Sequence, residues 1–181
     1  EIEADTRGKI LSVKSSEFSG IGTDSRVDLK GKFFIAFKGE NFDAHDFIPQ
    51  AVEKGASGIL THIWKPEWEP LKGKTTFVQV KDTVKALQAM GLGHRKRSRA
   101  QILAITGSNG KTTTKEFTAA ILNTVKKTHF NIGSFNNHWG VPLTLLGIEP
   151  EHEVAVVEMG MNHAGEIKEL MKLALPDVVV C

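Results

Sequence analysis

Glycine, lysine and threonine residues gather in the stretch "LAITGSNGKTTTKEF", residues 103–117. Gly107 and Gly110 lack a β-carbon and tolerate positive φ, so the backbone between them can come close to a phosphate group. In a phosphate-binding loop, Lys111 would reach the β- and γ-phosphates of a nucleotide and the Thr112 hydroxyl would bind Mg²⁺. This order of residue types therefore predicts a nucleotide-phosphate site.

The elements around this turn must position it. An apolar strand is expected at residues 102–106 and a helix at 113–127. The start of that helix directs free N–H groups and the positive end of the helix dipole at the same point. The general pattern has a further glycine where this chain has Ile105, so the match is to the shorter form G-x-x-G-K-T. A plain strand-to-helix turn is the alternative, but the position between strand and helix favours phosphate binding.

A glutamate ends the next apolar strand, "VAVVEMG", residues 154–160. Ligands gather at the carboxyl ends of parallel strands, so Glu158 is expected near Thr112, where a carboxylate oxygen suits Mg²⁺. The alternative is a glutamate that only caps the next turn. Further along, two roles are open for Glu166, either capping of the following helix or a part in the chemistry.

Strands and helices alternate through the second half of the chain. The expected order is strand 102–106, helix 113–127, strand 154–158, helix 166–175 and strand 178–180. Apolar stripes are predicted for both helices, formed by Phe117, Ala120, Ile121 and Val125 in the first and by Ile167, Leu170, Met171 and Ala174 in the second. Near-continuous apolar strands separated by helices predict a parallel sheet that is covered on both faces.

The first half predicts a β-loop-α-β unit. Strands are expected at 32–37, 58–60 and 76–80, with a helix that begins at Asp46 as N-cap and ends before Gly55. A further helix carries Val84, Leu87 and Met90, and its basic end, His94 to Arg99, is interpreted as a solvated helix end and linker. We predict an α/β fold with a small amino-terminal domain, 1–98, followed by part of a parallel-sheet domain, 99–181.

Composition limits the class of protein. The 181 residues are 40% hydrophobic and 24% charged, as in an ordinary globular protein, and 23 Lys+Arg against 21 Asp+Glu leave a net charge of +2. This balance gives no support to a nucleic-acid binder. Cys181 is the single cysteine, so no internal disulfide can form, and no apolar stretch is long enough to span a bilayer. We expect a cytoplasmic protein. Because the chain begins with Glu1 and ends in "DVVVC", we also expect a piece of something longer.

Four motifs together resemble a known family. They are "TGSNGKTTTKE" (106–116), "NIGSFNNHWGVPLTLL" (131–146), "EMGMNHAGEI" (158–167) and the stretch from "TDSR" to "SGIL" (23–60). The set is similar to the Mur ligases, the ATP-dependent amino-acid ligases of peptidoglycan synthesis, from about Thr23 to the end of the chain. Within that family it looks most like the members that join D-alanyl-D-alanine to UDP-N-acetylmuramoyl-tripeptide in the bacterial cytoplasm.

The resemblance implies roles for the matching residues. ATP would be held by Gly107, Ser108, Asn109, Gly110, Lys111, Thr112 and Thr113, magnesium by Thr112 and Glu158, the UDP end of the substrate by Ser25, Arg26, His45 and Asp46, and the sugar-nucleotide near the phosphates by Asn136 and Asn137. Lys111 and Glu158 would be the catalytic pair, acting on a γ-phosphoryl group that passes to the peptide carboxylate. For the "DAHDF" loop the alternative is a turn plus helix cap, with Asp46 able to do both. For the "SFNNHWG" loop the alternative is a plain structural loop, since paired asparagines are also good turn formers.

The chain also departs from the family pattern. The later lysine that is carbamylated in the family, a histidine near it, and a third domain that closes over ATP would all follow Cys181. We therefore expect this chain to bind ligands as a monomer without turning over.

Several other functions stay open at this stage. One is a sister ligase, either the enzyme that adds the third peptide residue or the folylpolyglutamate synthetase type, although the latter lacks the "TDSR" module. A second is a non-catalytic nucleotide-sugar binding module, against which the intact set of Lys111, Thr112 and Glu158 argues. A third is a nucleic-acid-stimulated ATPase, which rests only on the basic run from Arg95 to Arg99.

Overall fold

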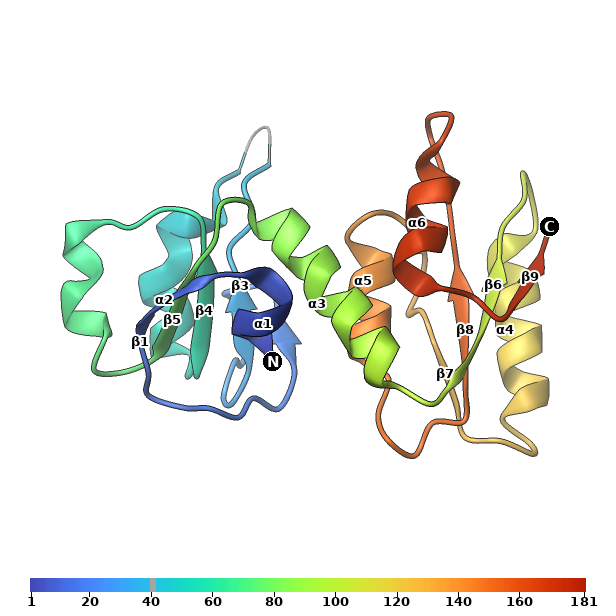
Figure 1. The fold of residues 1–181 in the computed structure, drawn as a ribbon, viewed down its shortest axis with the longest axis horizontal. Coiled ribbons are helices and arrows are strands. Elements are labelled where there is room, and N and C mark those ends of the chain that lie inside the picture. Colours follow the sequence, from blue (N-terminus) through green and yellow to red (C-terminus); the bar gives the residue numbers. More distant parts are fainter. Residues whose placement is uncertain (40–41) are drawn as a thin grey trace. The chain divides into compact units, whose positions relative to one another are not determined.

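The chain folds into two compact units. The computed structural model describes residues 1–39 and 42–181, and it divides into Glu1–Leu87 and Gln88–Cys181 (Figure 1). The division falls inside helix α3 (Thr83–Arg97), whereas we predicted a boundary between residues 98 and 99, behind that helix. None of the helices in the described ranges is long and apolar enough to cross a membrane.

A five-stranded sheet forms the first unit. Its order is β1 (Lys9–Ser12), β5 (Thr76–Gln79), β4 (Gly58–Thr61), β3 (Phe33–Ile35) and β2 (Ile21–Gly22), with α1 (Ile2–Thr6), the 3₁₀ helices η1 (Ala44–Phe47) and η2 (Pro66–Leu71), and α2 (Ile48–Glu53) around it. Only β1 is antiparallel to its neighbour. Phe34, Ile59 and Phe77 from the sheet pack with Ile48 and Trp68, so the β-loop-α-β prediction is confirmed.

The helix start predicted at Asp46 is wrong. A short 3₁₀ helix, η1, precedes α2, and its N-cap is Asp43, whose carboxylate accepts a hydrogen bond from the backbone N–H of His45 at 3.0 Å. The earlier aspartate captures the free N–H groups first, which leaves Asp46 inside the turn. The end of the helix agrees with the prediction, because Gly55 follows it with a φ of 89°.

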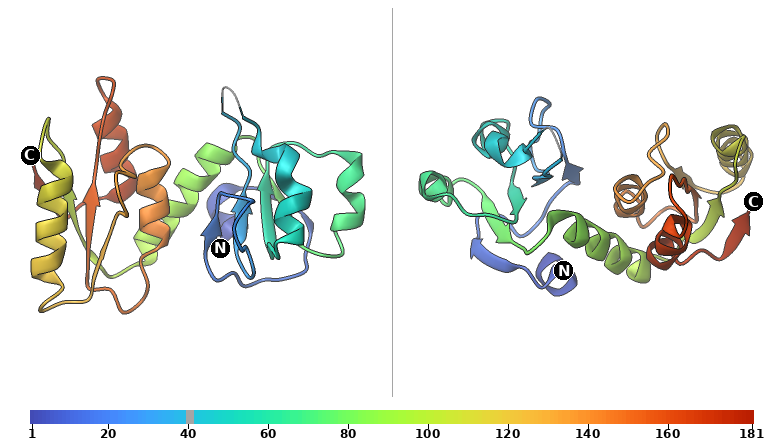
Figure 2. Two further views of the ribbon diagram at one scale, coloured as in Figure 1. Left: turned by 180° about the vertical axis from the view of Figure 1, so that it is seen from behind. Right: turned by 90° about the horizontal axis from the view of Figure 1, so that it is seen from above.

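A four-stranded parallel sheet forms the second unit, in the order β7 (Thr128–Phe130), β8 (Val154–Glu158), β6 (Gln101–Ile105) and β9 (Val178–Val180). Successive side chains of β8 alternate between two cores. Val154 and Val156 lie in a cluster with α4 (Lys111–Leu122), and Ala155 and Val157 lie in a cluster with α5 (Gly140–Leu146) and α6 (Glu166–Ala174). The predicted parallel sheet with both faces covered is confirmed (Figure 2).

The apolar stripe predicted for the first helix of this unit is wrong. Phe117, Ile121 and Val125 are 67%, 68% and 77% exposed, and Ala120 is exposed too. The helix presents a different row to the sheet, formed by Lys115 and Ala119, and it ends at Leu122. A buried lysine made this row look polar in the sequence. The stripe of α6 is confirmed, with Leu170 and Ala174 buried and Ile167 and Met171 packed beside them.

Candidate functional site

The glycine turn has the backbone conformation that its sequence predicts. Gly107 and Gly110 have φ values of 132° and 75°, in the region that glycine adopts without strain. Gly110 is the N-cap of α4, and no side chain among the described residues caps this helix start. The first N–H groups of α4 are thereby left for an outside acceptor, which is the arrangement that binds a phosphate.

The side chains of the turn lie at its open surface. Lys111 is the first residue of α4, and its ammonium group donates to the carbonyl of Gly107 at 2.8 Å. Ser108, Asn109, Thr112 and Thr113 are exposed. A lysine and hydroxyl groups therefore surround the free helix start, and these are the groups that bind a nucleotide phosphate and its metal ion.

Glu158 ends β8 directly beside this turn. Its register partner is Ile105, the last residue of β6, which leads into the glycine turn. The side chain is 1% exposed, and its Oε1 accepts a hydrogen bond from the Asn136 side-chain amide at 2.7 Å. Asn131 holds the backbone of the same residue, accepting from its N–H at 2.6 Å and donating to its carbonyl at 3.2 Å.

The second oxygen of this carboxylate fits a metal ion. Oε2 of Glu158 is buried and has no hydrogen-bond partner within the described part of the chain. A buried carboxylate oxygen is costly unless a donor or a cation meets it. No group of three or more His, Cys, Asp or Glu side chains that could hold a metal occurs in residues 1–39 and 42–181. Mg²⁺ typically binds to one or two carboxylates together with substrate phosphates, so a single glutamate beside a phosphate turn suits it.

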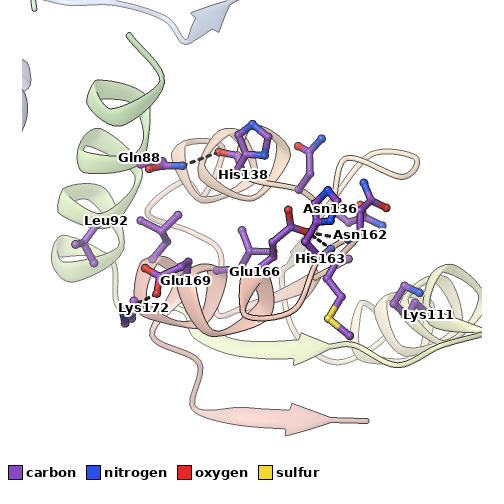
Figure 3. A pocket seen from close by; sticks show the side chains of 15 residues that line it. Gln88, Leu92, Lys111, Asn136, His138, Asn162, His163, Glu166, Glu169 and Lys172 are labelled. Carbon is purple, nitrogen blue, oxygen red and sulfur yellow. Dashed lines mark hydrogen bonds and ion pairs between the residues drawn. The ribbon is translucent and has the colours of Figure 1, made fainter. Parts of the chain in front are cut away.

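A cavity of about 970 Å³ opens beside the glycine turn (Figure 3). Its lining comes from α3, α6, Lys111 and the loops before α5 and α6, namely Gln88, Leu92, Lys111, Asn136, Asn137, His138, Gly160, Met161, Asn162, His163, Glu166, Glu169, Leu170, Lys172 and Leu173. In Figure 3, Asn136, Asn162 and His163 cluster together, and Lys111 lies apart from them on the side of α4. This is a large site with both polar and apolar lining next to the predicted phosphate position.

The two predicted asparagines contact different groups. Asn136 holds Glu158, whereas the side-chain oxygen of Asn137 accepts from the backbone N–H groups of Trp139 and Gly140, both at 3.0 Å. Asn137 thus stabilises the turn that leads into α5, as the structural-loop alternative expected. Both residues also line the cavity, and their contact with a sugar-nucleotide stays a prediction.

Glu166 shapes the loop in front of α6. Its Oε2 accepts from the backbone N–H groups of Asn162 at 2.7 Å and His163 at 3.1 Å. These two hydrogen bonds lower the pKa of the Glu166 carboxyl. These contacts lie in the loop: Gly165 is the N-cap of α6, and no side chain among the described residues caps this helix, so the capping alternative is not what Glu166 does here.

The first unit has a cavity of its own, of about 440 Å³, at the carboxyl ends of β2 and β3. It is lined by Thr23, Asp24, Ser25, Arg26, Phe34, Phe42, Ala44 and Phe47. Ser25 is 6% exposed and donates to the Gln50 side chain at 2.9 Å, so it is fixed in place. The Arg26 side chain is 83% exposed and pairs with Asp24 at 2.7 Å, which lowers the pKa of the Asp24 carboxyl to about 2. Arg26 gives this cavity a cation that can turn towards an anionic ligand.

Two aromatic rings that sequence reasoning missed stand at the same cavity. Phe42 and Phe47 stack with ring centroids 5.1 Å apart and planes 16° apart, although the residues are 57% and 39% exposed. An exposed apolar pair at the edge of a cavity offers a flat surface to a ligand ring. Exposed aromatic residues have no periodic sequence pattern, but their positions on either side of the predicted "DAHD" turn were a usable signal.

His45 and Asp46 hold the loop and are not among the residues that line the cavity. The His45 ring is fully buried, with Nδ1 2.5 Å from Asp43 Oδ1 and Nε2 accepting from the backbone N–H of His62. Burial lowers the pKa of His45. Asp46 pairs with Lys65 at 2.7 Å on the surface. The predicted contact of these two side chains with a UDP group stays a prediction.

Two family models match the chain. The model of the "Mur ligase family, catalytic domain" matches residues 17–108, more than half of the chain, and the model of the "Mur ligase middle domain" matches residues 105–181. The chain belongs to the Mur ligase family.

Three similar proteins of this family illustrate the match. The UDP-N-acetylmuramoyl-tripeptide–D-alanyl-D-alanine ligase of Escherichia coli is 41% identical over 97% of this chain. The crystal structure of MurF from Acinetobacter baumannii has a TM-score of 0.89 at 36% identity over 98% of the chain, and MurF of Thermotoga maritima, solved in complex with ADP, has 0.75 at 30% over 87%. The chain spans 39%, 39% and 36% of the length of these three proteins.

Proposed function

We propose that this chain forms the precursor-binding and ATP-binding part of a ligase that joins D-alanyl-D-alanine to UDP-N-acetylmuramoyl-tripeptide. The observation that carries the proposal is the meeting of the glycine turn with the buried carboxylate of Glu158 at the ends of neighbouring strands β6 and β8. The names of the relatives supply the substrates. In the bacterial cytoplasm, the whole enzyme would act as a monomer in peptidoglycan synthesis.

The glycine turn would bind the phosphates of ATP. Phosphoryl transfer asks a protein mainly for positioning and for neutralisation of charge. The free N–H groups at the start of α4 and the Lys111 ammonium would do both for the β- and γ-phosphates. Thr112 and Glu158 would hold Mg²⁺, which supplies further positive charge at the phosphates when it is bound.

The reaction proposed for the whole enzyme proceeds through an acyl phosphate. An oxygen of the peptide carboxylate attacks the γ-phosphorus of ATP, the bond to the bridging oxygen breaks, and ADP leaves. The amine of D-alanyl-D-alanine then attacks the acyl carbon, phosphate leaves with the bonding electrons, and the amine loses a proton. The cavity of about 970 Å³ beside Lys111 is large enough to bring the carboxylate end of the precursor to the phosphates.

The cavity of the first unit would hold the UDP end of the precursor. The guanidinium of Arg26 would pair with the diphosphate, since arginine matches phosphate oxygens with two parallel hydrogen bonds. The stacked rings of Phe42 and Phe47 would receive the uracil ring. This arrangement needs both a cation and a flat apolar surface, and the residues lining the cavity provide the two together.

Calorimetric titration of the chain tests this proposal. We expect binding of UDP-N-acetylmuramoyl-tripeptide, weakened about tenfold by Arg26→Ala, and magnesium-dependent binding of ADP that Arg26→Ala leaves unchanged. Arg99→Ala removes the same charge at an exposed position outside the cavity and serves as the control. Equal affinity for the precursor with a dipeptide would favour the ligase that adds the third residue. Folded protein that binds neither ligand would contradict the proposal.

A further inference from the structure

Lys115 is a buried cation on the sheet-facing row of α4. The residue is fully buried, and its ammonium group donates to the carbonyl oxygens of Asn131 at 2.8 Å and Gly133 at 2.9 Å. It also lies 3.0 Å from a carboxylate oxygen of Glu116 and 5.8 Å from the centre of the Phe130 ring. The lysine thus joins α4 to the segment that follows β7.

Packing alone does not explain a lysine at this position. Ala119, one turn further along the same row, is buried in an apolar cluster, so an apolar residue would suit the contact with the sheet. Burial of an ammonium group is costly unless hydrogen bonds and a counter-charge compensate it. The two backbone carbonyls and Glu116 provide that compensation. The specific contribution of Lys115 is therefore its donors and not its volume.

The segment that Lys115 holds has little apolar burial to fix its shape. Ile132 is 82% exposed and Phe135 is 58% exposed, and Gly133 and Ser134 are exposed as well. We call residues 131–137 the asparagine loop. Its described anchors are polar: Lys115 donates to two of its carbonyls, and the Asn131 side chain donates to its own loop at the Phe135 carbonyl, 2.6 Å away.

The asparagine loop in turn fixes Glu158. Asn131 bonds to both backbone groups of Glu158, and the Asn136 amide donates to Oε1, which leaves the buried Oε2 without a hydrogen-bond partner among the described residues. A continuous set of hydrogen bonds therefore runs from Lys115 through the loop to the carboxylate. Because Lys115 lies one turn after Lys111 on α4, one helix carries both the phosphate lysine and the anchor of the metal carboxylate.

We infer that Lys115 is a positioning residue that sets the orientation of the Glu158 carboxylate, and through it the affinity for Mg²⁺, by holding the asparagine loop. The inference rests on the proposed function, in which Glu158 helps to bind the magnesium nucleotide. In this role Lys115 contacts neither nucleotide nor metal. Its effect passes through Asn136, in the way that outer groups orient the ligands of a metal.

The test is ADP binding with and without Mg²⁺, measured by calorimetry on this chain. Lys115→Met replaces the ammonium with an apolar group of similar length, and Lys126→Met makes the same change at an exposed position as the control. We expect the Mg²⁺ concentration for half-maximal enhancement of ADP binding to rise about tenfold or more in Lys115→Met. ADP affinity in EDTA should stay within about twofold, and Lys126→Met should match the parent.

A double-mutant cycle separates positioning from general damage. If Lys115 acts through Asn136, then Lys115→Met in an Asn136→Ala background should add little to the magnesium effect of Asn136→Ala alone. Additive effects would overturn the inference. An unchanged magnesium dependence, or an equal loss of ADP binding with and without Mg²⁺, would overturn it as well. If Lys115→Met does not unfold cooperatively, Lys115→Arg is tested by the same criteria. For this variant, the Mg²⁺ concentration for half-maximal enhancement of ADP binding must rise about threefold.

A second measurement keeps the inference separate from the proposed function. If the parent chain binds ADP without any effect of Mg²⁺, the proposed function fails and this part of the inference fails with it. Hydrogen exchange without ligand then tests the structural link. Faster exchange confined to residues 131–137 in Lys115→Met supports the role of Lys115 in holding the loop, and unchanged exchange there overturns it.

Discussion

The two units offer a ligand very different surfaces. In the second unit the glycine turn presents backbone N–H groups, and the buried Glu158 is held by Asn136 at its carboxylate and by Asn131 at its backbone. In the first unit the cavity presents side chains at the surface: Arg26 is 83% exposed and the Phe42–Phe47 stack is open to solvent. A site built from backbone and buried polar groups is set when the chain folds, whereas one built from exposed side chains can adjust to its ligand.

The largest effect is expected from the removal of Lys111, which should act on the second unit alone. Lys111→Ala should weaken ADP binding by about 3 kcal/mol, roughly a hundredfold, because charge-assisted hydrogen bonds to the phosphates are lost. Binding of the UDP precursor should change little, since its UDP end is assigned to the other unit. Titration with each ligand checks this, and Lys126→Ala is the matched exposed lysine. A strong loss of both ligands would mean that the two sites are not independent.

Adding a methyl group at Gly160 tests how rigid the second site is. A β-carbon there would lie 2.7 Å from the Asn136 side-chain oxygen, so Asn136 must move away from Glu158. Gly160→Ala should lower the free energy of unfolding by about 1–3 kcal/mol and weaken the magnesium dependence of ADP binding. Gly73→Ala is the control, because nothing lies within 4 Å of its added β-carbon. Urea unfolding measures the stability and calorimetry measures the magnesium dependence of ADP binding. If Gly160→Ala matches Gly73→Ala in both quantities, Asn136 can move without effect and the site is not rigid.

Truncation of one ring of the Phe42–Phe47 stack should act on the first unit alone. Phe47→Ala should weaken binding of the UDP precursor by about 1–2 kcal/mol, near tenfold, through lost stacking on a base. Stability should change little because the ring is 39% exposed. Phe117→Ala, at a 67% exposed ring of α4, should leave precursor binding as it was. Fluorescence competition with UDP reports both variants, and equal binding by Phe47→Ala and the parent would remove the ring from the site.

The smallest expected effect is on stability at mildly acid pH, and it should occur in both units. Burial is the main cause that lowers the pKa of His45 in the first unit and of His129 in the second. The unfolded chain then binds protons more readily than the folded one, so stability is full above the ordinary histidine pKa near 6.5 and falls as pH drops through the lowered folded values.

Urea unfolding at pH 7.5 and at pH 5 measures this loss. In His45→Asn, the decrease in unfolding free energy between pH 7.5 and pH 5 should be smaller than in the parent. The decrease that remains should be the part caused by His129 in the second unit. A loss at pH 5 as large as that of the parent would show that His45 is not its source.

Local pattern predicted the parts of the molecule that depend on neighbouring residues. The glycine turn, the end of β8 at Glu158 and the stripe of α6 all follow from residues close in the sequence, and the structure confirms them. By contrast, α5 begins with Gly140 and contains Pro142, which are typical of loops, and its helical state depends on packing of Val141 and Leu145 against the sheet.

The missed parts of the site depend on contacts between distant residues. From the sequence, Lys115 is expected on the exposed side of α4, because lysine is a charged residue. The fold brings the carbonyls of residues 131 and 133 to its ammonium group. The same residue led to the wrong apolar stripe, because a lysine occupies the row that faces the sheet. The stacking of Phe42 and Phe47 could not be predicted from an apolar pattern, because both residues are exposed and the turn between them brings their rings together.

The alternation of side chains along β8 gives the carboxylate its side of the sheet. Val154 and Val156 pack towards α4, and Glu158 follows them at the same parity, so its side chain leaves the strand on the face where α4 lies. The odd or even position of a residue along the strand thus decides on which face of the sheet a reactive side chain lies. A single-residue deletion within residues 154–157 would place the thioether of Met159 on the face towards α4 and turn the Glu158 carboxylate to the opposite face.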